Sequence, residues 1–479
     1  MVVGALDIST DVLVIGSGPG GYVAAIRAAQ LGFEVLVVEK EKRIGGVCLH
    51  TGCIPTKALI HASDYSEVIN CYKTMGITFK DVNVDLNKIN SWKNGVIDEL
   101  ERGIKSLFKN YGIEVIEGTA VFKSNNEVHI EGKTDISNIK FKHCIIATGS
   151  SPINVPGFNF DGKYVISSTE ALNLDSTGVP QHLIIIGGGY IGTELGTVYS
   201  KLGSKITIVE FTDRLIPSIN SEIVSLVSNK LDKFGVTKLF NSKALGCEIR
   251  NDKVYVKISR EGKEETIEGS KVLVVVGRSP NTKGIGLENT SVKLDSKGFI
   301  IVDKQQRTSV NNIFAIGDVV GQPMLAHKAT REGKIAAEVI AGMPSAFDNK
   351  VIPFVVFNDP ELASVGMTEP DAKAKGIDYI AVKFPFSALG RSKTLNEGEG
   401  FLKYVAEKNT RQILGVHIVG PHASDIIGEA TLAIEMGATL DDIALTIHAH
   451  PSYPESLMEG AEMLLKKGIH IYNPEFKKK

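Results

Sequence analysis

Short runs of apolar residues alternate along the chain with glycine turns and helical segments. Residues 11–39 read as a strand, a glycine turn, a helix and a second strand, and residues 183–210 repeat this order. The first strand is expected to begin at about Asp11. Each copy ends on a glutamate, Glu39 or Glu210, that lies 23 residues after the first glycine of its turn. The matching plan predicts two structurally equivalent units.

Short strands that are apolar throughout, alternating with helices, indicate parallel sheets that are buried beneath helices on both faces. Three further strands end in glycine, at Gly149, Gly277 and Gly317. A strand that ends in glycine presents its backbone closely to a ligand at the carboxyl edge of the sheet. We therefore expect these strand ends to line ligand sites.

The pattern changes from about residue 351, where prolines become frequent and a strand over 412–418 precedes helices over 424–436 and 440–447. The sequence therefore predicts an α/β fold of two Rossmann-like dinucleotide-binding domains followed by an α+β domain. The expected boundaries are 1–150 for the first domain, 151–279 for the second, 280–350 for a central segment returning to the first, and 351–479 for the α+β domain.

Composition narrows the class of partner. The chain has 479 residues, of which 43% are hydrophobic, so it can bury several cores. A formal net charge of -2 provides no basic field for nucleic acid or acidic lipid. No stretch approaches the roughly 20 uninterrupted apolar residues that a membrane span needs. We therefore expect neither a nucleic-acid nor a membrane partner.

The cysteine usage points to a reducing compartment. Five cysteines are an odd and sparse set, which argues against a secreted disulfide framework. The first ten residues contain Asp7 and no Arg or Lys, so they indicate neither a secretory nor a transit leader. We expect a cytoplasmic protein.

Both glycine turns have the G-x-G-x-x-G spacing. The first glycine makes the tight bend, the second admits a pyrophosphate to the backbone, and the third lets helix and strand pack closely. The helix N-terminus then offers free N–H groups to the phosphates. One turn is expected to hold FAD and the other a nicotinamide. The glycines are Gly16, Gly18 and Gly21 in the first copy, and Gly187, Gly189 and Gly192 in the second.

The two terminal glutamates predict the kind of nucleotide. A carboxylate at this position accepts hydrogen bonds from ribose hydroxyls and repels the 2′-phosphate of NADP. Arg214 is the only cation near Glu210, so NAD is expected rather than NADP. The competing interpretation is that Glu39 and Glu210 are ordinary solvated strand ends.

Cys48 and Cys53 are the only cysteines close together in sequence. Their spacing is not a zinc pattern by itself, because ligand pairs lie two to four residues apart and a second pair is missing. On an ideal helix they would be about 7.5 Å apart along the axis, beyond what a disulfide spans. We therefore expect a distorted helix between them, which Gly52 would permit. A disulfide under local constraint is of the more reducible, catalytic sort.

Motifs spread over the whole chain resemble those of the flavoprotein disulfide reductases, most closely the branch that oxidises dihydrolipoamide with NAD+. They occur in the family's order and at roughly its spacing, and the cysteine block is the most specific. The matching segments are Gly16-Ser-Gly-Pro-Gly-Gly21, Gly45-Gly-x-Cys48-x4-Cys53-Ile-Pro-Thr-Lys57, Ala147-Thr-Gly-Ser150, Gly187-Gly-Gly-Tyr-Ile-Gly-x-Glu194, Gly277-Arg-x-Pro-Asn281, Gly317-Asp318 and His448-Ala-His450-Pro451.

The resemblance implies roles for particular residues. Cys48 would be the exposed thiol that exchanges with substrate, and Cys53 the thiol beside the flavin. Lys57 would lie near flavin N5 and pair with Glu194, and Asp318 would bond the FAD ribityl chain at a helix N-terminus. The implied FAD-binding residues are Gly16, Gly18, Gly21, Glu39, Lys57, Thr148, Gly149, Gly317 and Asp318. The implied NAD-binding residues are Gly187, Gly189, Gly192, Glu210 and Gly277.

His450 and Glu455 are the expected proton-transfer pair. In the family this pair reaches the disulfide of the other subunit, so the resemblance implies a homodimer whose interface is the C-terminal domain. His448 is the rival by proximity, with a packed structural histidine as its competing interpretation. The bond between His450 and Pro451 is often cis in relatives.

The sequence differs from the residues most common in the family at Val47, at His50-Thr51 and at residues 452–454. The spacing from His450 to Glu455 is kept. These changes leave the chemistry intact, and they fall where they would affect the detailed substrate preference and the path of the 451–454 loop.

The implied activity is oxidation of dihydrolipoamide to lipoamide through the cysteine pair and FAD, with hydride passed to NAD+. The implied partner is the lipoyl-bearing acyltransferase of a 2-oxoacid dehydrogenase complex. One alternative is a related reductase acting on another small disulfide with NAD(P)H, and another is a mainly structural subunit of such a complex. Reductases with a C-terminal redox pair are disfavoured, because no cysteine follows Cys247.

Overall fold

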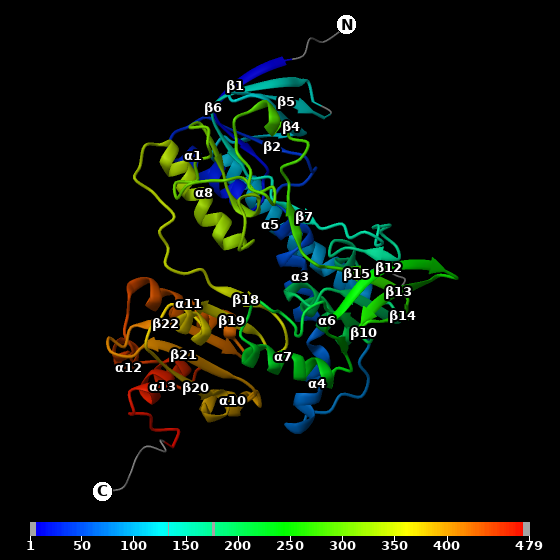
Figure 1. Cartoon of the computed structure of the whole chain (residues 1–479), viewed down its shortest axis with the longest axis vertical. Coiled ribbons are helices and arrows are strands. Elements are labelled where there is room, and N and C mark those ends of the chain that lie inside the picture. Colours follow the sequence, from blue (N-terminus) through cyan, green and yellow to red (C-terminus); the bar gives the residue numbers. More distant parts are fainter. Residues whose placement is uncertain (1–5, 133, 175–177, 473–479) are drawn as a thin grey trace.

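The computed structural model describes residues 6–132, 134–174 and 178–472. Three domains follow one another along the chain, and Figure 1 shows that the first is completed by a segment returning from the second. The α/β class and the three-part architecture predicted from the sequence are confirmed.

The first domain is built on a sheet of order β3-β2-β1-β6-β5-β4, with β17 added beside β6. Its centre is parallel, and β4 and β5 form an antiparallel extension. The strands are β1 Leu6–Ile15, β2 Val35–Glu39, β3 Glu114–Glu117, β4 Thr119–Ser124, β5 Glu127–Glu131, β6 Ile136–Ile146 and β17 Ile313–Ala315. The helices are α1 Pro19–Gln30, α2 Gly46–Thr51, α3 Cys53–Ser63, α4 Tyr65–Thr74, α5 Leu86–Asn110 and α8 Ala326–Ile340.

The first strand begins earlier than the sequence pattern predicted. β1 starts at Leu6 rather than at about Asp11. The extra residues include polar Asp7 and Ser9, so they lack the apolar run of residues 12–15. They are strand because they pair with Ile136–Phe141 of the long strand β6, a partner that local hydrophobicity does not reveal.

The second domain repeats the plan on a sheet of order β11-β10-β9-β15-β8. Its strands are β8 Val165–Ile166, β9 His182–Ile186, β10 Lys205–Val209, β11 Thr237–Leu239 and β15 Lys271–Val274, and its helices are α6 Tyr190–Lys201 and α7 Ser221–Lys233. A separate antiparallel sheet contains β12 Ser242–Arg250, β13 Lys253–Arg260 and β14 Lys263–Gly269. The short strands β7 Ser150–Pro152 and β16 Arg278–Pro280 pair where the chain leaves and re-enters the first domain.

The C-terminal domain is an antiparallel sheet of order β18-β19-β22-β21-β20 with helices packed on it. The strands are β18 Phe354–Val356, β19 Leu362–Gly366, β20 Tyr379–Pro385, β21 Phe401–Glu407 and β22 Ile413–Val419. The helices are α9 Glu369–Ala374, α10 Gly390–Leu395, α11 Ala423–Met436, α12 Leu440–Leu445 and α13 Glu455–Leu464. The sequence pattern located α11 and α12 but missed α13, since Pro451 and Pro454 precede it.

One hydrophobic cluster joins all three domains. It contains Leu59 of α3, Leu195 and Val198 of α6, and Val356 and Leu362 of the C-terminal domain, all at most 3% exposed. The helices α3 and α6 therefore lie against each other at the junction of the domains, as Figure 1 shows.

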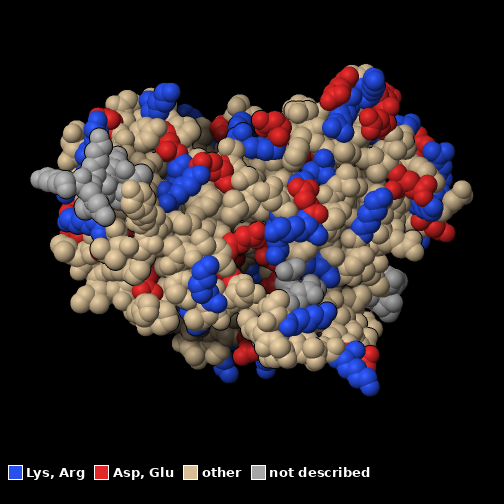
Figure 2. Space-filling model, turned by 90° about the horizontal axis from the view of Figure 1, so that it is seen from below, with Lys and Arg blue, Asp and Glu red and all other residues tan. Residues whose placement is uncertain are grey.

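The surface carries both signs of charge. On the face in Figure 2, basic and acidic side chains are interspersed and neither gathers into one large patch. Across the described ranges, none of the helices combines the length and the apolar character needed to cross a membrane.

Candidate functional site: a cysteine pair between two nucleotide folds

The first glycine turn leaves room for a ligand at one glycine only. Gly16 has φ +99°, and a Cβ there would lie 2.5 Å from the carbonyl oxygen of Ala147. A Cβ on Gly21 would lie 1.9 Å from the carbonyl oxygen of Gly16. A Cβ on Gly18, the N-cap of α1, would have no heavy atom within 4 Å. The turn therefore fits a pyrophosphate approaching the Gly18 backbone at the helix N-terminus.

The second turn has the same geometry. A Cβ on Gly187 would lie 2.6 Å from the carbonyl oxygen of Val275, and one on Gly192 would lie 2.1 Å from that of Gly187. Gly189, the N-cap of α6, is again open. Both copies thus have two glycines required by close backbone packing and one open towards a ligand.

Both terminal glutamates are buried rather than solvated, at 7% and 8% exposure, which excludes the interpretation as ordinary strand ends. Glu39 accepts hydrogen bonds from the backbone N–H and the hydroxyl of Ser17, at 2.8 and 2.6 Å. Glu210 accepts from the Gly188 N–H at 2.6 Å and from Thr212 at 2.8 Å. Each carboxylate is therefore held beside the backbone of its glycine turn, where a nucleotide ribose would lie.

The glycine-terminated strands of the first domain meet around Asn281 and Asp318. Asn281 donates its backbone N–H to Gly149 at 2.9 Å and its side-chain amide to the carbonyl of Thr148 at 2.9 Å. Asp318 accepts the Ser150 hydroxyl at 2.5 Å. These contacts place Thr148, Gly149 and Asp318 at one sheet edge.

Two polar groups at this edge were not singled out from the sequence. Arg278 follows Gly277 and donates its Nε to the Ser150 hydroxyl at 2.7 Å. Glu332 of α8 is 3% exposed and accepts the backbone N–H of Gly317 at 2.7 Å. Arg278 lay within a matched motif, whereas Glu332 is an unremarkable helix residue in sequence and only the return of α8 to the first domain reveals its contact.

The helix carrying the cysteine pair is broken between them, as the spacing predicted. α2 ends at Thr51 and α3 begins at Cys53, with Gly52 at φ -147° and ψ -114°. A Cβ on Gly52 would lie 2.9 Å from the carbonyl oxygen of Val47. The close approach of these two backbone segments explains the glycine and brings the two thiols close enough for each to affect the pKa of the other.

The two thiols differ in acidity. The hydrogen bond from Cys48 lowers the pKa of Cys53 to about 7, and the charge of Lys57 acts in the same direction, while burial and Glu194 oppose it. The same hydrogen bond, together with burial, raises the pKa of Cys48 well above its usual range. These directions favour Cys53 over Cys48 as the thiolate of the reduced pair.

The two cysteines differ in exposure in the single chain. Cys53 is exposed and Cys48 is half-buried. Cys53 is the first residue of α3, so no preceding turn of that helix covers it, whereas Cys48 lies within α2. The expectation that Cys48 is the thiol open to substrate concerns the FAD-loaded dimer and stays a prediction.

Lys57 and Glu194 form the expected pair across the two nucleotide folds. The Lys57 ammonium donates to both carboxylate oxygens of Glu194, at 2.9 and 3.0 Å. Phe357 of the C-terminal domain donates its backbone N–H to the same carboxylate at 2.9 Å, and its ring centroid lies 4.6 Å from the ammonium. Phe357, which the sequence did not single out, ties the third domain to this ion pair.

The histidines near the C-terminus are distinguished by their partners. His450 is joined through Nδ1 to Glu455 at 2.8 Å, and its side chain is 75% exposed. His448 has only 5% of its side chain exposed and is held by Glu429 and by the carbonyl of Thr446, each at 2.9 Å. His448 is thus the packed histidine. His450 is bonded to Glu455 through Nδ1, and within the described ranges its Nε2 makes no hydrogen bond. The His450–Pro451 bond is cis.

Across the described ranges, no hydrogen bond or ion pair joins His450 or Glu455 to the cysteines of the same chain. The structure therefore holds two half-sites. One contains the thiols with Lys57 and Glu194, and the other contains the exposed imidazole.

Comparisons with known proteins agree with this geometry. Residues 10–333 match the model of the pyridine nucleotide-disulphide oxidoreductases, and residues 352–461 match the dimerisation domain of that family. The chain belongs to the pyridine nucleotide-disulphide oxidoreductase family, so it is an oxidoreductase, and the resemblance inferred from the motifs is confirmed. The C-terminal domain is the family's dimerisation domain, which supports a homodimer.

Individual relatives extend over nearly the whole chain. The dihydrolipoyl dehydrogenase of Geobacillus stearothermophilus is 50% identical over 98% of this chain and 99% of its own. That of Bacillus subtilis is 48% identical over 98% of this chain and all of its own. Among solved structures, the HOCl-induced flavoprotein disulfide reductase of Escherichia coli is similar with a TM-score of 0.84 and 28% identity, covering 95% of this chain and 99% of its own.

Proposed function

We propose that this protein oxidises dihydrolipoamide to lipoamide with bound FAD and passes the hydride to NAD+. The observation that carries the proposal is a pair of thiols whose pKa values are shifted in opposite directions. The pair lies beside the Lys57–Glu194 ion pair, between two glycine turns whose open glycine could admit a pyrophosphate. The curated relatives named dihydrolipoyl dehydrogenase support the choice of substrate.

The residues named for each cofactor fit it. FAD would lie on the first turn, with Gly18 at its pyrophosphate, Glu39 at its ribose, and Thr148, Gly149, Gly317 and Asp318 at the sheet edge. NAD would lie on the second turn, with Gly189, Glu210 and Gly277. Glu210 favours NAD over NADP, because its buried carboxylate would repel a 2′-phosphate. When bound, FAD supplies a two-electron relay between the dithiol and NAD+.

The thiol chemistry follows from the acidity of the pair. A thiolate of dihydrolipoamide attacks the sulfur of Cys48, which breaks the Cys48–Cys53 disulfide, forms a mixed disulfide and releases Cys53 as the thiolate that its lowered pKa favours. The second substrate thiol then attacks the mixed disulfide, which closes lipoamide and leaves Cys48 reduced. The pair has gained the two electrons that the substrate lost.

Both substrate thiols must lose a proton for these attacks. His450 of the partner subunit would accept the first proton at Nε2, while Glu455 fixes the tautomer through Nδ1. The second proton would pass to the sulfur of Cys48, which leaves as a thiolate when lipoamide closes. The raised pKa of Cys48 favours this transfer, and in the return reaction the imidazole would remove that proton. The proposed active site is therefore completed by the dimer.

The proposal extends to organisation and partners. The first domain would bind FAD through residues 1–150 and the returning segment 280–350, the second would bind NAD through residues 151–279, and residues 351–479 would form the dimer interface. The proposed partner is the lipoyl-bearing acyltransferase of a 2-oxoacid dehydrogenase complex, in the cytoplasm.

A steady-state comparison tests the function directly. The purified FAD-loaded protein is supplied with dihydrolipoamide, dithiothreitol or reduced glutathione, with NAD+ and NADP+ in parallel. The proposal expects the highest kcat/KM for dihydrolipoamide with NAD+. A higher value with another thiol, or with NADP+, would redirect the assignment within the family.

A further inference from the structure

A second ion pair lies two helical turns beyond Lys57 and Glu194 on the same two helices. Asp64, the C-cap of α3, accepts a hydrogen bond from Lys201 at the end of α6, at 2.8 Å. In each helix the second charge follows the first by seven residues, or about 10 Å along the axis. The polarity is reversed, with the lysine on α3 in the first pair and on α6 in the second.

The C-terminal domain binds both pairs through one short segment. Phe357 donates its N–H to Glu194 at 2.9 Å, and two residues later Asp359 accepts from Lys201 at 2.5 Å. Segment 357–359 therefore contacts α6 at both charged positions. These two pairs define where α3, α6 and the segment lie relative to one another.

Lys201 is the most buried charged group of this arrangement. Its side chain is 1% exposed, against 42% for Asp64 and 29% for Asp359, and its ammonium lies 5.2 Å from the ring centroid of Phe234. Burial opposes its charge, but Asp359 and Asp64 together raise the pKa of Lys201 above its usual value. A buried cation held by two carboxylates from two other domains is weak evidence for added stability, since desolvation offsets the attraction. Its geometric consequence is that the positions of α3, α6 and segment 357–359 relative to one another are fixed.

We propose that Lys201 is a positioning residue for the redox centre: by tying α6 to Asp64 and Asp359, it holds Lys57 in place beside Cys53. This inference rests on the proposed function, because the role of Lys57 there is to stabilise charge at the thiol and flavin. Lys201 itself contacts neither cysteine through a hydrogen bond that the described residues show.

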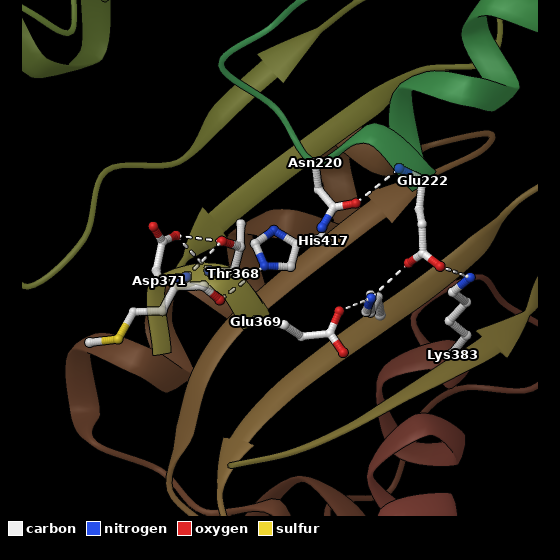
Figure 3. Close-up of polar contacts among 9 residues, drawn as sticks. Asn220, Glu222, Thr368, Glu369, Asp371, Lys383 and His417 are labelled. Carbon is white, nitrogen blue, oxygen red and sulfur yellow. Dashed lines mark hydrogen bonds and ion pairs between the residues drawn. The ribbon is translucent and has the colours of Figure 1, made fainter. Parts of the chain in front are cut away.

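A matched control exists elsewhere in the fold. Lys403 of β21 has 7% of its side chain exposed and also binds two carboxylates, Glu222 of α7 at 2.7 Å and Glu369 of α9. It joins the second domain to the C-terminal domain, as Lys201 does. Figure 3 shows Glu222 and Glu369 converging on this point, with Lys383 on the other side of Glu222. Removing either lysine takes away a cation shared by two partly buried carboxylates. In each case one carboxylate keeps a second lysine, since Asp359 also contacts Lys230 at 3.9 Å and Glu222 also binds Lys383 at 2.5 Å. Only Lys201 lies on α6.

The test compares Lys201→Met with Lys403→Met in the FAD-loaded protein. Each variant is reduced by two electrons with dithionite, and the long-wavelength absorbance of the Cys53 thiolate beside the flavin is titrated against pH. We expect Lys201→Met to raise the midpoint by about one pH unit, because Lys57 lowers the pKa of Cys53 and is no longer held. Its kcat should fall about 10 to 100-fold with the KM for dihydrolipoamide unchanged.

Lys403→Met should lower the thermal midpoint to a similar extent while leaving the pH midpoint and kcat at their wild-type values. Equal pH midpoints and kcat values in the two variants would overturn the proposal. A wild-type protein that shows the band but does not oxidise dihydrolipoamide contradicts the proposed substrate, and the pH midpoints still decide the role of Lys201.

Asp359→Ala distinguishes an effect of Lys201 on the position of Lys57 from a direct effect of its charge on Cys53. Loss of a nearby negative charge would, by its field alone, lower the midpoint of Cys53. Loss of the Lys201 anchor would raise it. The proposal expects a rise, and a fall would show that Lys201 acts through its charge alone.

Discussion

Neutralising the two members of the Lys57–Glu194 pair should move the acidity of Cys53 in opposite directions. Glu194→Gln removes a charge that raises the pKa of Cys53, whereas Lys57→Met removes one that lowers it. Glutamine keeps the shape of glutamate and an oxygen that can accept the Phe357 N–H, so the local geometry is kept. The direction of each shift therefore follows from the sign of the removed charge.

The size of the shift follows from Coulomb's law. Cys53 and Lys57 lie four residues apart on α3, or about 6 Å along the helix axis. A unit charge at that distance in an effective dielectric of about 20 is worth about 2.8 kcal/mol, or about 2 pH units. The side chain of Lys57 is 32% exposed, so solvent screens part of this interaction. We expect the midpoint of the long-wavelength band to fall by about one pH unit in Glu194→Gln and to rise by about one unit in Lys57→Met.

The assay is a pH titration of the two-electron-reduced, FAD-loaded variants, followed at the wavelength of the thiolate–flavin band. Asp378→Asn, which alters an exposed carboxylate of the C-terminal domain that pairs with Lys408, gives the scale of a remote charge change. Shifts of the same sign in Glu194→Gln and Lys57→Met, or no shift in either, would refute the electrostatic reasoning.

Two further predictions concern the histidine pair and the first glycine turn. His450→Gln should slow dihydrolipoamide oxidation on the order of 10² to 10⁴-fold with flavin content unchanged, and His448→Gln should mainly lower the thermal midpoint; if the larger kinetic loss falls on His448, the base has been misassigned. Gly18→Ala should fold normally but bind FAD about tenfold more weakly by calorimetry, because its methyl group would occupy the open face of the turn. Gly21→Ala should instead lower the free energy of unfolding by about 3 kcal/mol, because its methyl group would collide with the backbone of Gly16. Wild-type FAD affinity in Gly18→Ala would contradict the placement of the pyrophosphate.

Most of the fold could be predicted because its signals are local. An apolar strand, a G-x-G-x-x-G turn and a terminal glutamate occur within one short stretch, and the role of Gly21 follows from its contact with the backbone of Gly16 inside that stretch. The helix break at Gly52 was likewise predictable, because only the spacing of Cys48 and Cys53 was needed.

The features that escaped prediction depend on partners far away in sequence. The first half of β1 is strand only because β6 pairs with it. Phe357 and Glu332 become functional neighbours only when the C-terminal domain and the returning helix pack against the nucleotide folds.

The central claim, that Cys48 exchanges with the dithiol while Cys53 serves the flavin, is tested most directly by Cys48→Ser in the FAD-loaded protein. Turnover of dihydrolipoamide with NAD+ and the long-wavelength absorbance band are measured on the same sample. We predict loss of turnover together with a visible Cys53 thiolate band that needs no reductant. Retained turnover, or a band that appears in Cys53→Ser instead, would contradict the assignment.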